Sequence, residues 1–167
     1  MKIFLIGPMG SGKSKIGRIL SEKLSISLFD IDKEIEKDLN MSITEIFASK
    51  GEIFFRNTET DYLIKTKGLR DCIVSTGGGV IEEIKNLEFL KKEANVVFLN
   101  CSVESQYENT KNSAKRPLLL TNDPKLTLQT LYEKRFDSYK KVSKLELLSD
   151  SMSNDEIANK IINYFNV

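Results

Sequence analysis

The chain has 167 residues, of which 40% are hydrophobic and 29% are charged, and its formal net charge is +1. This length and composition suit one globular domain with one core, and the near-neutral charge argues against a partner that is a nucleic acid. No apolar run approaches the roughly 20 residues of a membrane span, and the N-terminus leads directly into a predicted strand, so we expect neither a membrane partner nor a signal peptide.

Short apolar runs alternate with amphipathic stretches along the whole chain. The predicted strands are Ile3–Ile6, Ser27–Asp30, Ile73–Ser75, Asn95–Leu99 and Leu145–Leu148. The predicted helices lie near residues 13–24, 32–39, 43–69, 81–92, 102–109, 125–141 and 154–166. This alternation indicates an α/β fold with a parallel sheet between layers of helices, in which ligands bind at the carboxyl ends of the strands.

The first loop has the spacing of a phosphate-binding P-loop. Residues 7–14 read GPMGSGKS, and they lie between a predicted strand and a predicted helix, as this motif requires. The glycines let backbone N–H groups turn toward phosphate oxygens, and the helix N-terminus adds partial positive charge. We expect Lys13 to reach the β- and γ-phosphates and the Ser14 hydroxyl to bind Mg²⁺. The alternative is a glycine turn without a ligand.

Two carboxylates, Asp30 and Asp32, follow at the end of the second strand. In an extended backbone they would point the same way. We expect one to help hold Mg²⁺, directly or through water, and the other to accept a proton from, or hydrogen-bond to, a substrate hydroxyl. The alternative is that they cap the helix that begins near Lys33. No Walker B aspartate follows the third strand, which increases the weight on Asp30.

Three arginines are candidates for binding anions. Arg56 lies one helical turn before Glu59, which could hold its guanidinium rigid. Arg135 interrupts an otherwise apolar helix face, where an arginine is costly unless it meets an anion. Arg116 lies in the polar, turn-rich residues 107–125, which suggest a lid. The alternatives are a surface ion pair, a surface arginine with a buried stem, and an ordinary surface loop.

The remaining features concern small residues and missing ones. Three glycines after the third strand, Gly77, Gly78 and Gly79, would let the backbone approach a ligand closely. Cys72 and Cys101 lie in strand-like segments, and we expect both to be small buried side chains. The chain has no histidine, so proton transfer falls to a carboxylate, lysine, tyrosine or water.

Taken together, these pieces resemble the shikimate kinase family. The matching segments are GPMGSGKS at 7–14, FDID at 29–32, GEIFFRNTE at 51–59, STGGG at 75–79, RPLL at 116–119 and RFDSY at 135–139. They follow the family's order and spacing. The P-loop is widespread, whereas the combination of the other segments is much more specific.

The resemblance implies a three-layer sandwich with a five-stranded parallel sheet, of the nucleoside-monophosphate-kinase type. Residues 1–167 would form one P-loop kinase domain, with substrate-binding helices at about 32–61 and a lid at about 109–124. The implied reaction transfers the γ-phosphoryl group of ATP to the 3-hydroxyl of shikimate, in the synthesis of aromatic amino acids. We expect a cytoplasmic monomer.

The family pattern also implies a role for each matching residue. The residues expected to bind the nucleotide phosphates are Gly10, Ser11, Gly12, Lys13, Ser14 and Lys15, and Mg²⁺ would be held by Ser14 and, through water, by Asp30. The residues expected to bind shikimate are Asp32, Arg56, Gly77, Gly78, Gly79 and Arg135. Arg116 would close with the lid onto the phosphates. The implied catalytic residues are Lys13, Asp32 and Arg116.

Three positions depart from the family pattern, and rival functions remain open. Asn109 stands where an arginine usually lies on adenine, Asp137 replaces a proline, and Asn40 replaces a glycine. We expect the first to weaken ATP binding. The nearest rivals are another small-molecule kinase of this fold, such as a gluconate kinase or a nucleoside monophosphate kinase, and a nucleotide-binding module without turnover.

Overall fold

Five parallel strands form one sheet at the centre of the computed structural model, which describes residues 1–112 and 116–167. The strands are β1 (Lys2–Ile6), β2 (Ser27–Asp30), β3 (Cys72–Ser75), β4 (Val96–Asn100) and β5 (Leu145–Leu148). Their order across the sheet is β2-β3-β1-β4-β5, and every neighbouring pair is parallel. The predicted strands are therefore correct to within about one residue, and the predicted fold class is confirmed.

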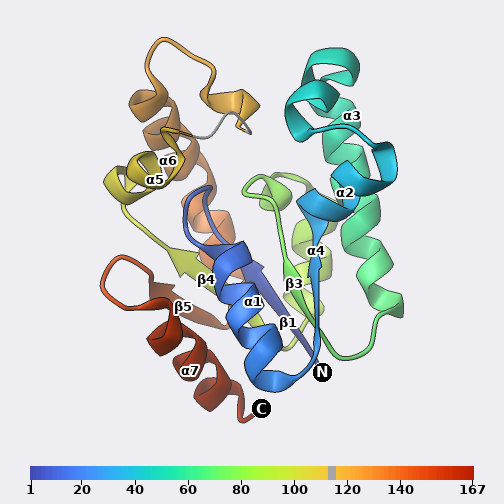
Figure 1. The fold of residues 1–167 in the computed structure, drawn as a ribbon, viewed down its shortest axis with the longest axis vertical. Coiled ribbons are helices and arrows are strands. Elements are labelled where there is room, and N and C mark those ends of the chain that lie inside the picture. The colour runs from blue at the N-terminus through green and yellow to red at the C-terminus, as the bar shows by residue number, and fades with distance from the viewer. Residues whose placement is uncertain (113–115) are drawn as a thin grey trace.

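The described residues also form seven α-helices and three short 3₁₀ helices. The α-helices are α1 (Lys13–Leu24), α2 (Ile31–Leu39), α3 (Ile43–Lys65), α4 (Ile84–Lys92), α5 (Val103–Thr110), α6 (Pro124–Val142) and α7 (Asn154–Phe165). The 3₁₀ helices are η1 (Thr66–Gly68), η2 (Val80–Glu82) and η3 (Pro117–Leu119). In Figure 1, α2 and α3 rise on one side above the carboxyl ends of the strands, and α5 and α6 rise on the other.

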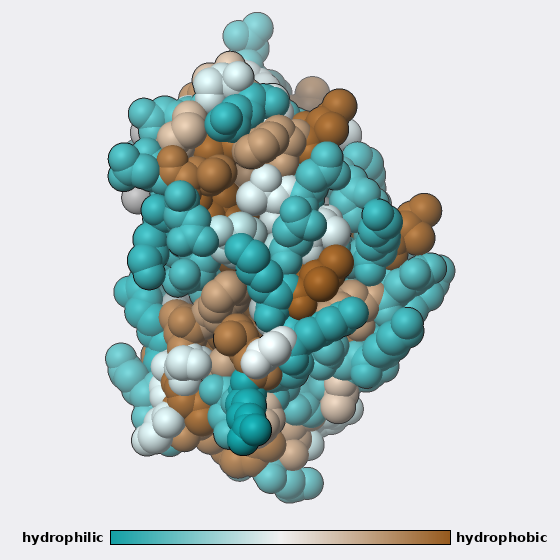
Figure 2. Space-filling view, turned by 90° about the vertical axis from the view of Figure 1, so that its right-hand side faces the viewer, coloured by the Kyte–Doolittle hydropathy of each residue, from teal (hydrophilic) through white to brown (hydrophobic). Residues whose placement is uncertain are grey.

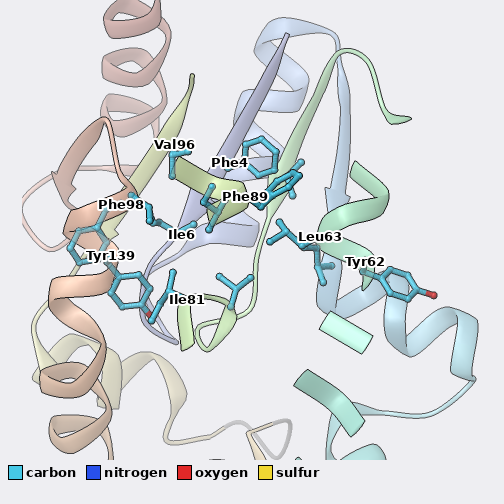
Figure 3. Packing of buried hydrophobic residues seen from close by; sticks show 14 of the residues in the cluster. Phe4, Ile6, Tyr62, Leu63, Ile81, Phe89, Val96, Phe98 and Tyr139 are labelled. Carbon is cyan, nitrogen blue, oxygen red and sulfur yellow. The ribbon is translucent and has the colours of Figure 1, made fainter. Parts of the chain in front are cut away.

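The central strands send alternate side chains into two cores, one on each face of the sheet. Ile3 and Leu5 of β1 pack on one face with side chains from α1 and α7. Phe4 and Ile6 point to the other face and pack with side chains from α3, α4 and α6. On this face the Tyr139 ring of α6 stacks on the Phe98 ring of β4 (Figure 3). Strands buried on both faces read as continuous apolar runs, which is why the sequence located them so well.

Several local expectations can be compared directly with the structure. Cys72 and Cys101 are both buried and free, as expected. Among the described residues, no helix is long and apolar enough to cross a membrane. On the face shown in Figure 2, hydrophobic side chains lie in separate groups between hydrophilic ones. Of the predicted lid, residues 113–115 lie outside the described part of the chain.

The structure corrects two expectations near the site. The predicted helix 43–69 ends at Lys65, and inside it Gly51 has non-helical dihedral angles (φ 83°, ψ 166°), so α3 consists of two helical pieces. The backbone is also not extended from Asp30 to Asp32, because α2 begins at Ile31. A carboxylate in a first helical turn is favoured by the helix dipole, which explains the early start.

Candidate active site

The P-loop connects β1 to α1 as predicted, and its lysine lies inside the loop. The Nζ atom of Lys13 donates hydrogen bonds to the carbonyl oxygens of Gly7 (2.8 Å) and Pro8 (2.7 Å). Burial is the main reason that the pKa of Lys13 is lowered to about 8, and the nearby Arg116 guanidinium is the second. An anion in the loop would therefore give this lysine the countercharge that its buried position lacks.

The two residues expected at the metal contact each other directly. The Ser14 hydroxyl donates to Oδ2 of Asp30 over 2.6 Å, and the Ser75 hydroxyl lies 3.4 Å from that of Ser14. Asp30 is also the N-cap of α2 and accepts from the Lys33 N–H, so the capping alternative holds as well. Mg²⁺ usually takes one or two protein ligands and completes its shell with phosphates and water, which fits this small oxygen set.

Asp32 lies in the first turn of α2, where its Oδ1 atom is buried without a hydrogen-bond partner. Burial raises the pKa of this carboxyl above its usual value, and the nearby Asp30 carboxylate adds to the rise. The positive charges of Arg116 and Lys13 act in the opposite direction. Buried polar atoms nearly always find a partner. An unpaired carboxylate oxygen at a pocket wall is therefore ready to accept a hydrogen bond from a ligand hydroxyl.

Arg56 is held by carboxylates on both sides, as its spacing from Glu59 predicted. Its Nη1 atom donates to Oε2 of Glu59 over 2.8 Å, and its Nη2 atom lies 3.1 Å from Oε1 of Glu52. Arg56 and Glu59 are both buried, so the alternative of a surface ion pair is wrong. Burial raises the pKa of Glu59 to about 7, and its Oε1 atom has no hydrogen-bond partner.

The glycines after β3 are required by the side chains that press against them. A Cβ atom on Gly77 would lie 2.1 Å from Oε1 of Glu59 and 3.0 Å from Oδ1 of Asp32. A Cβ atom on Gly79 would lie 2.3 Å from Nη1 of Arg56. The glycines thus leave room for the charged groups of the pocket, and any larger residue would displace them.

Arg135 is 3% exposed and points inward from α6, as predicted. Its partner is a carboxylate of the protein itself, Glu82, which the sequence analysis did not predict. The Nε and Nη2 atoms of Arg135 both lie 2.5 Å from Oε1 of Glu82, at the end of η2. Lys134 also contacts Glu82, at 3.1 Å. No local pattern indicates this pair, because Glu82 lies 53 residues before Arg135 and beside a second glutamate.

Two neighbouring pockets open at the carboxyl ends of the strands. One is lined by Arg56, Glu59, Gly77, Gly79, Arg135 and several apolar side chains from α3 and the lid. The other is polar and holds the P-loop residues 10–15 together with Ser149, Asp150 and Asn154. Asp32, Gly78 and Arg116 line both pockets. All sequence-predicted site residues except Asp30 therefore line these pockets, and Asp30 contacts Ser14 of the polar pocket.

One of the three positions that depart from the family pattern, Asn109, contacts the P-loop. Asn109, near the end of α5, lies at the wall of the polar pocket, and its Nδ2 atom donates to the carbonyl oxygen of Gly10 over 2.9 Å. The side chain therefore contacts the backbone of the P-loop.

Tyr139 is a site residue that sequence reasoning missed. Its hydroxyl donates to the Gly78 carbonyl oxygen over 2.5 Å.

Comparisons with known proteins agree with this geometry. A family model described as shikimate kinase matches residues 9–166. A shikimate kinase from Marinomonas sp. (strain MWYL1) is 40% identical over 162 residues, which cover 96% of this chain and 89% of that relative. The shikimate kinase of Psychromonas ingrahamii is 39% identical over 160 residues, covering 96% of this chain and 94% of the relative.

Solved structures give the same result. The structure of shikimate kinase from Acinetobacter baumannii in complex with shikimate superposes with a TM-score of 0.95 at 35% identity, covering 98% of this chain and 92% of the other. A deoxyadenosine kinase from M. mycoides with bound dATP has a TM-score of 0.65 at 17% identity and full coverage of both chains, which is a likeness of fold alone. The chain belongs to the shikimate kinase family.

Proposed function

We propose that the chain transfers the γ-phosphoryl group of ATP to the 3-hydroxyl of shikimate at the place where the two pockets meet. The observation that carries this proposal is that Asp32, Gly78 and Arg116 line both pockets. A group transferred between two bound molecules must pass between their sites. An acid, a backbone and a lid arginine at that junction are the groups that such a transfer needs.

The polar pocket would bind the triphosphate. Residues 10–15 line this pocket at the N-terminus of α1, where backbone N–H groups would offer donors and the Lys13 ammonium positive charge. Ser14 and, through water, Asp30 are the residues that would hold Mg²⁺. When bound, the metal ion neutralises part of the triphosphate charge. Lys13 and Arg116 would supply further positive charge at the group being transferred, where negative charge spreads during the reaction.

The smaller pocket would bind shikimate. Arg56 and Arg135 are both buried at its wall, and planar guanidinium groups suit a carboxylate well. The unpaired Oδ1 atom of Asp32 would accept a hydrogen bond from the reacting hydroxyl. The raised pKa of Asp32 makes it a stronger base than an exposed carboxylate, so it can take the hydroxyl proton as the oxygen attacks phosphorus.

The arrangement of the elements suggests a division of labour within one domain. Residues about 32–61 would form the substrate-binding helices, and residues about 109–124 would form a lid that brings Arg116 to the phosphates. The proposed working unit is a monomer. The expected compartment is the cytoplasm, where ATP is supplied.

A coupled assay of ADP release with a panel of acceptors tests the proposal against its rivals. We expect turnover with shikimate and background rates with gluconate and AMP. Nuclear magnetic resonance of the product should show phosphorus coupled to the proton on carbon 3 of the ring. Faster turnover of gluconate or AMP, or a phosphate on another hydroxyl, would contradict the assignment.

A further inference from the structure

We propose that Asn109 is a positioning residue that fixes the tip of the P-loop, and thereby the N–H groups expected around the nucleotide phosphates. This role presupposes the kinase function proposed above. It differs from the role that an adenine-stacking arginine has at this position, because the contact is to the protein backbone. Asn109 would act on the phosphate site and not on the base.

The first observation is the hydrogen bond itself. The side-chain amide of Asn109 donates to the Gly10 carbonyl oxygen over 2.9 Å and so links α5 to a loop 99 residues earlier in the chain. Gly10 has a φ of 80°, a conformation with no regular secondary structure to support it. The turn around Gly10 is closed by a hydrogen bond from the Ser11 N–H to the Pro8 carbonyl oxygen (3.3 Å), and the Asn109 donor adds a restraint from outside the loop.

The second observation is that Gly10 packs closely against α5. A Cβ atom on Gly10 would lie 2.9 Å from the carbonyl oxygen of Gln106 and 3.2 Å from Cγ2 of Thr110, so loop and helix are already in contact. Both helix residues are buried. Thr110 donates to the Gln106 carbonyl oxygen (2.7 Å), and Gln106 donates to that of Cys101 (3.2 Å).

The consequence for the ligand follows from the chain order. Ser11, Gly12 and Lys13 come directly after Gly10, so a tip that is held in place also holds their N–H groups. Because Asn109 contacts Gly10, its contribution should be equal for every ligand that places phosphates in the loop. The same bond joins the P-loop to the helix from which the lid segment begins.

Calorimetry with two probes distinguishes this role from a contact with the base. The probes are ADP and inorganic tripolyphosphate, which has no base. Asn109→Leu removes the donor without adding charge, and we expect both probes to bind about three- to tenfold more weakly, the effect of one hydrogen bond. The KM values for ATP and GTP should rise by the same factor, with the KM for shikimate unchanged. Asn163→Leu, on an exposed part of α7, is the matched control and should change nothing.

The binding of the two probes to Asn109→Leu decides between a contact with the P-loop and a contact with the base. Weaker binding of ADP with unchanged binding of tripolyphosphate would assign Asn109 to the base and overturn the proposal, as would unchanged binding of both. If Asn109→Leu does not fold, Asn109→Ser is measured instead, and the same losses are expected because serine is too short to reach Gly10. The wild-type chain is assayed first: binding of tripolyphosphate without turnover of shikimate would contradict the kinase function while leaving the role of Asn109 standing.

Discussion

At the scale of single residues, the substrate pocket is built from charges that are paired before any ligand arrives. Arg56 has Glu52 and Glu59, and Arg135 has Glu82. A buried guanidinium without a partner would cost several kcal/mol, so these pairs permit the arginines to lie where a carboxylate can reach them. They also fix the direction of each guanidinium, which reduces the ordering that binding requires.

Replacement of Glu82 by glutamine should weaken shikimate binding. The variant keeps the shape but loses the charge that holds Arg135, and we expect the KM for shikimate to rise roughly three- to tenfold with that for ATP unchanged. Steady-state kinetics with each substrate varied in turn measures both values. Glu83→Gln, at the exposed neighbouring position, is the control. Tighter shikimate binding in Glu82→Gln would instead mean that Glu82 competes with the substrate carboxylate.

At the scale of elements, the position of Arg56 depends on the break in α3. Gly51 has φ 83° and ψ 166°, a region that only glycine occupies without strain. The second helical piece starts there and carries Glu52, Arg56 and Glu59 on one face. Without the break, this face would continue the direction of the first piece.

Gly51→Ala should destabilise the protein by about 1–3 kcal/mol through backbone strain alone, because a Cβ atom there meets nothing within 4 Å. We also expect a higher KM for shikimate, since Arg56 would be displaced. Urea unfolding gives the stability. Gly68→Ala is the matched control, because that site is equally open and lacks a positive φ. Equal stabilities of the two variants would show that the strain at Gly51 is relieved by a shift of the helix.

The elements also show where sequence reasoning succeeds and where it fails. The strands were predicted closely because buried parallel strands are continuous apolar runs bounded by polar turns. The break at Gly51 was not predicted, because the apolar pattern of α3 continues across it. Most site residues were found through short motifs, whose spacing is local. The pairs Glu82–Arg135 and Asn109–Gly10 depend on tertiary contacts between distant segments, and no local pattern encodes them.

At the scale of the whole molecule, a nearly neutral chain concentrates opposite charges at one edge of its sheet. Parallel strands end at the same edge, so residues from the end of β2, the loop after β3 and helices α1, α2, α3, α5, α6 and α7 meet there. The buried groups include Lys13, Arg56 and Arg135 beside Asp30 and Glu59. Such an arrangement lowers the stability of the empty protein and favours ligands that complete the pairing.

The pH dependence of stability should reveal this cost at Glu59. Burial raises its pKa to about 7 in the folded chain, against about 4.3 in an unfolded one, while Arg56, Asp32 and Arg135 also face it. Between these values the folded state binds more protons, so this group's contribution to stability is present at low pH and is lost as pH rises toward 7.

Glu59→Gln removes this titration. We expect the unfolding free energy of the variant, relative to wild type, to increase by about 2–3 kcal/mol from pH 5 to pH 8. Urea unfolding across this range measures the difference, with Glu88→Gln on the exposed side of α4 as the control. Parallel profiles for wild type and Glu59→Gln would mean that Glu59 is ionised throughout.

The most direct test of phosphoryl transfer at the junction of the two pockets is the single-turnover rate of Asp32→Asn with both substrates saturating. Asparagine keeps the size of the side chain and cannot take a proton. We expect a rate at least about a hundredfold below wild type, the usual scale of general-base assistance, with the affinity for ADP unchanged by calorimetry. A folded variant that retains more than half of the wild-type rate would contradict the assignment of Asp32 and, with it, the proposed place of transfer.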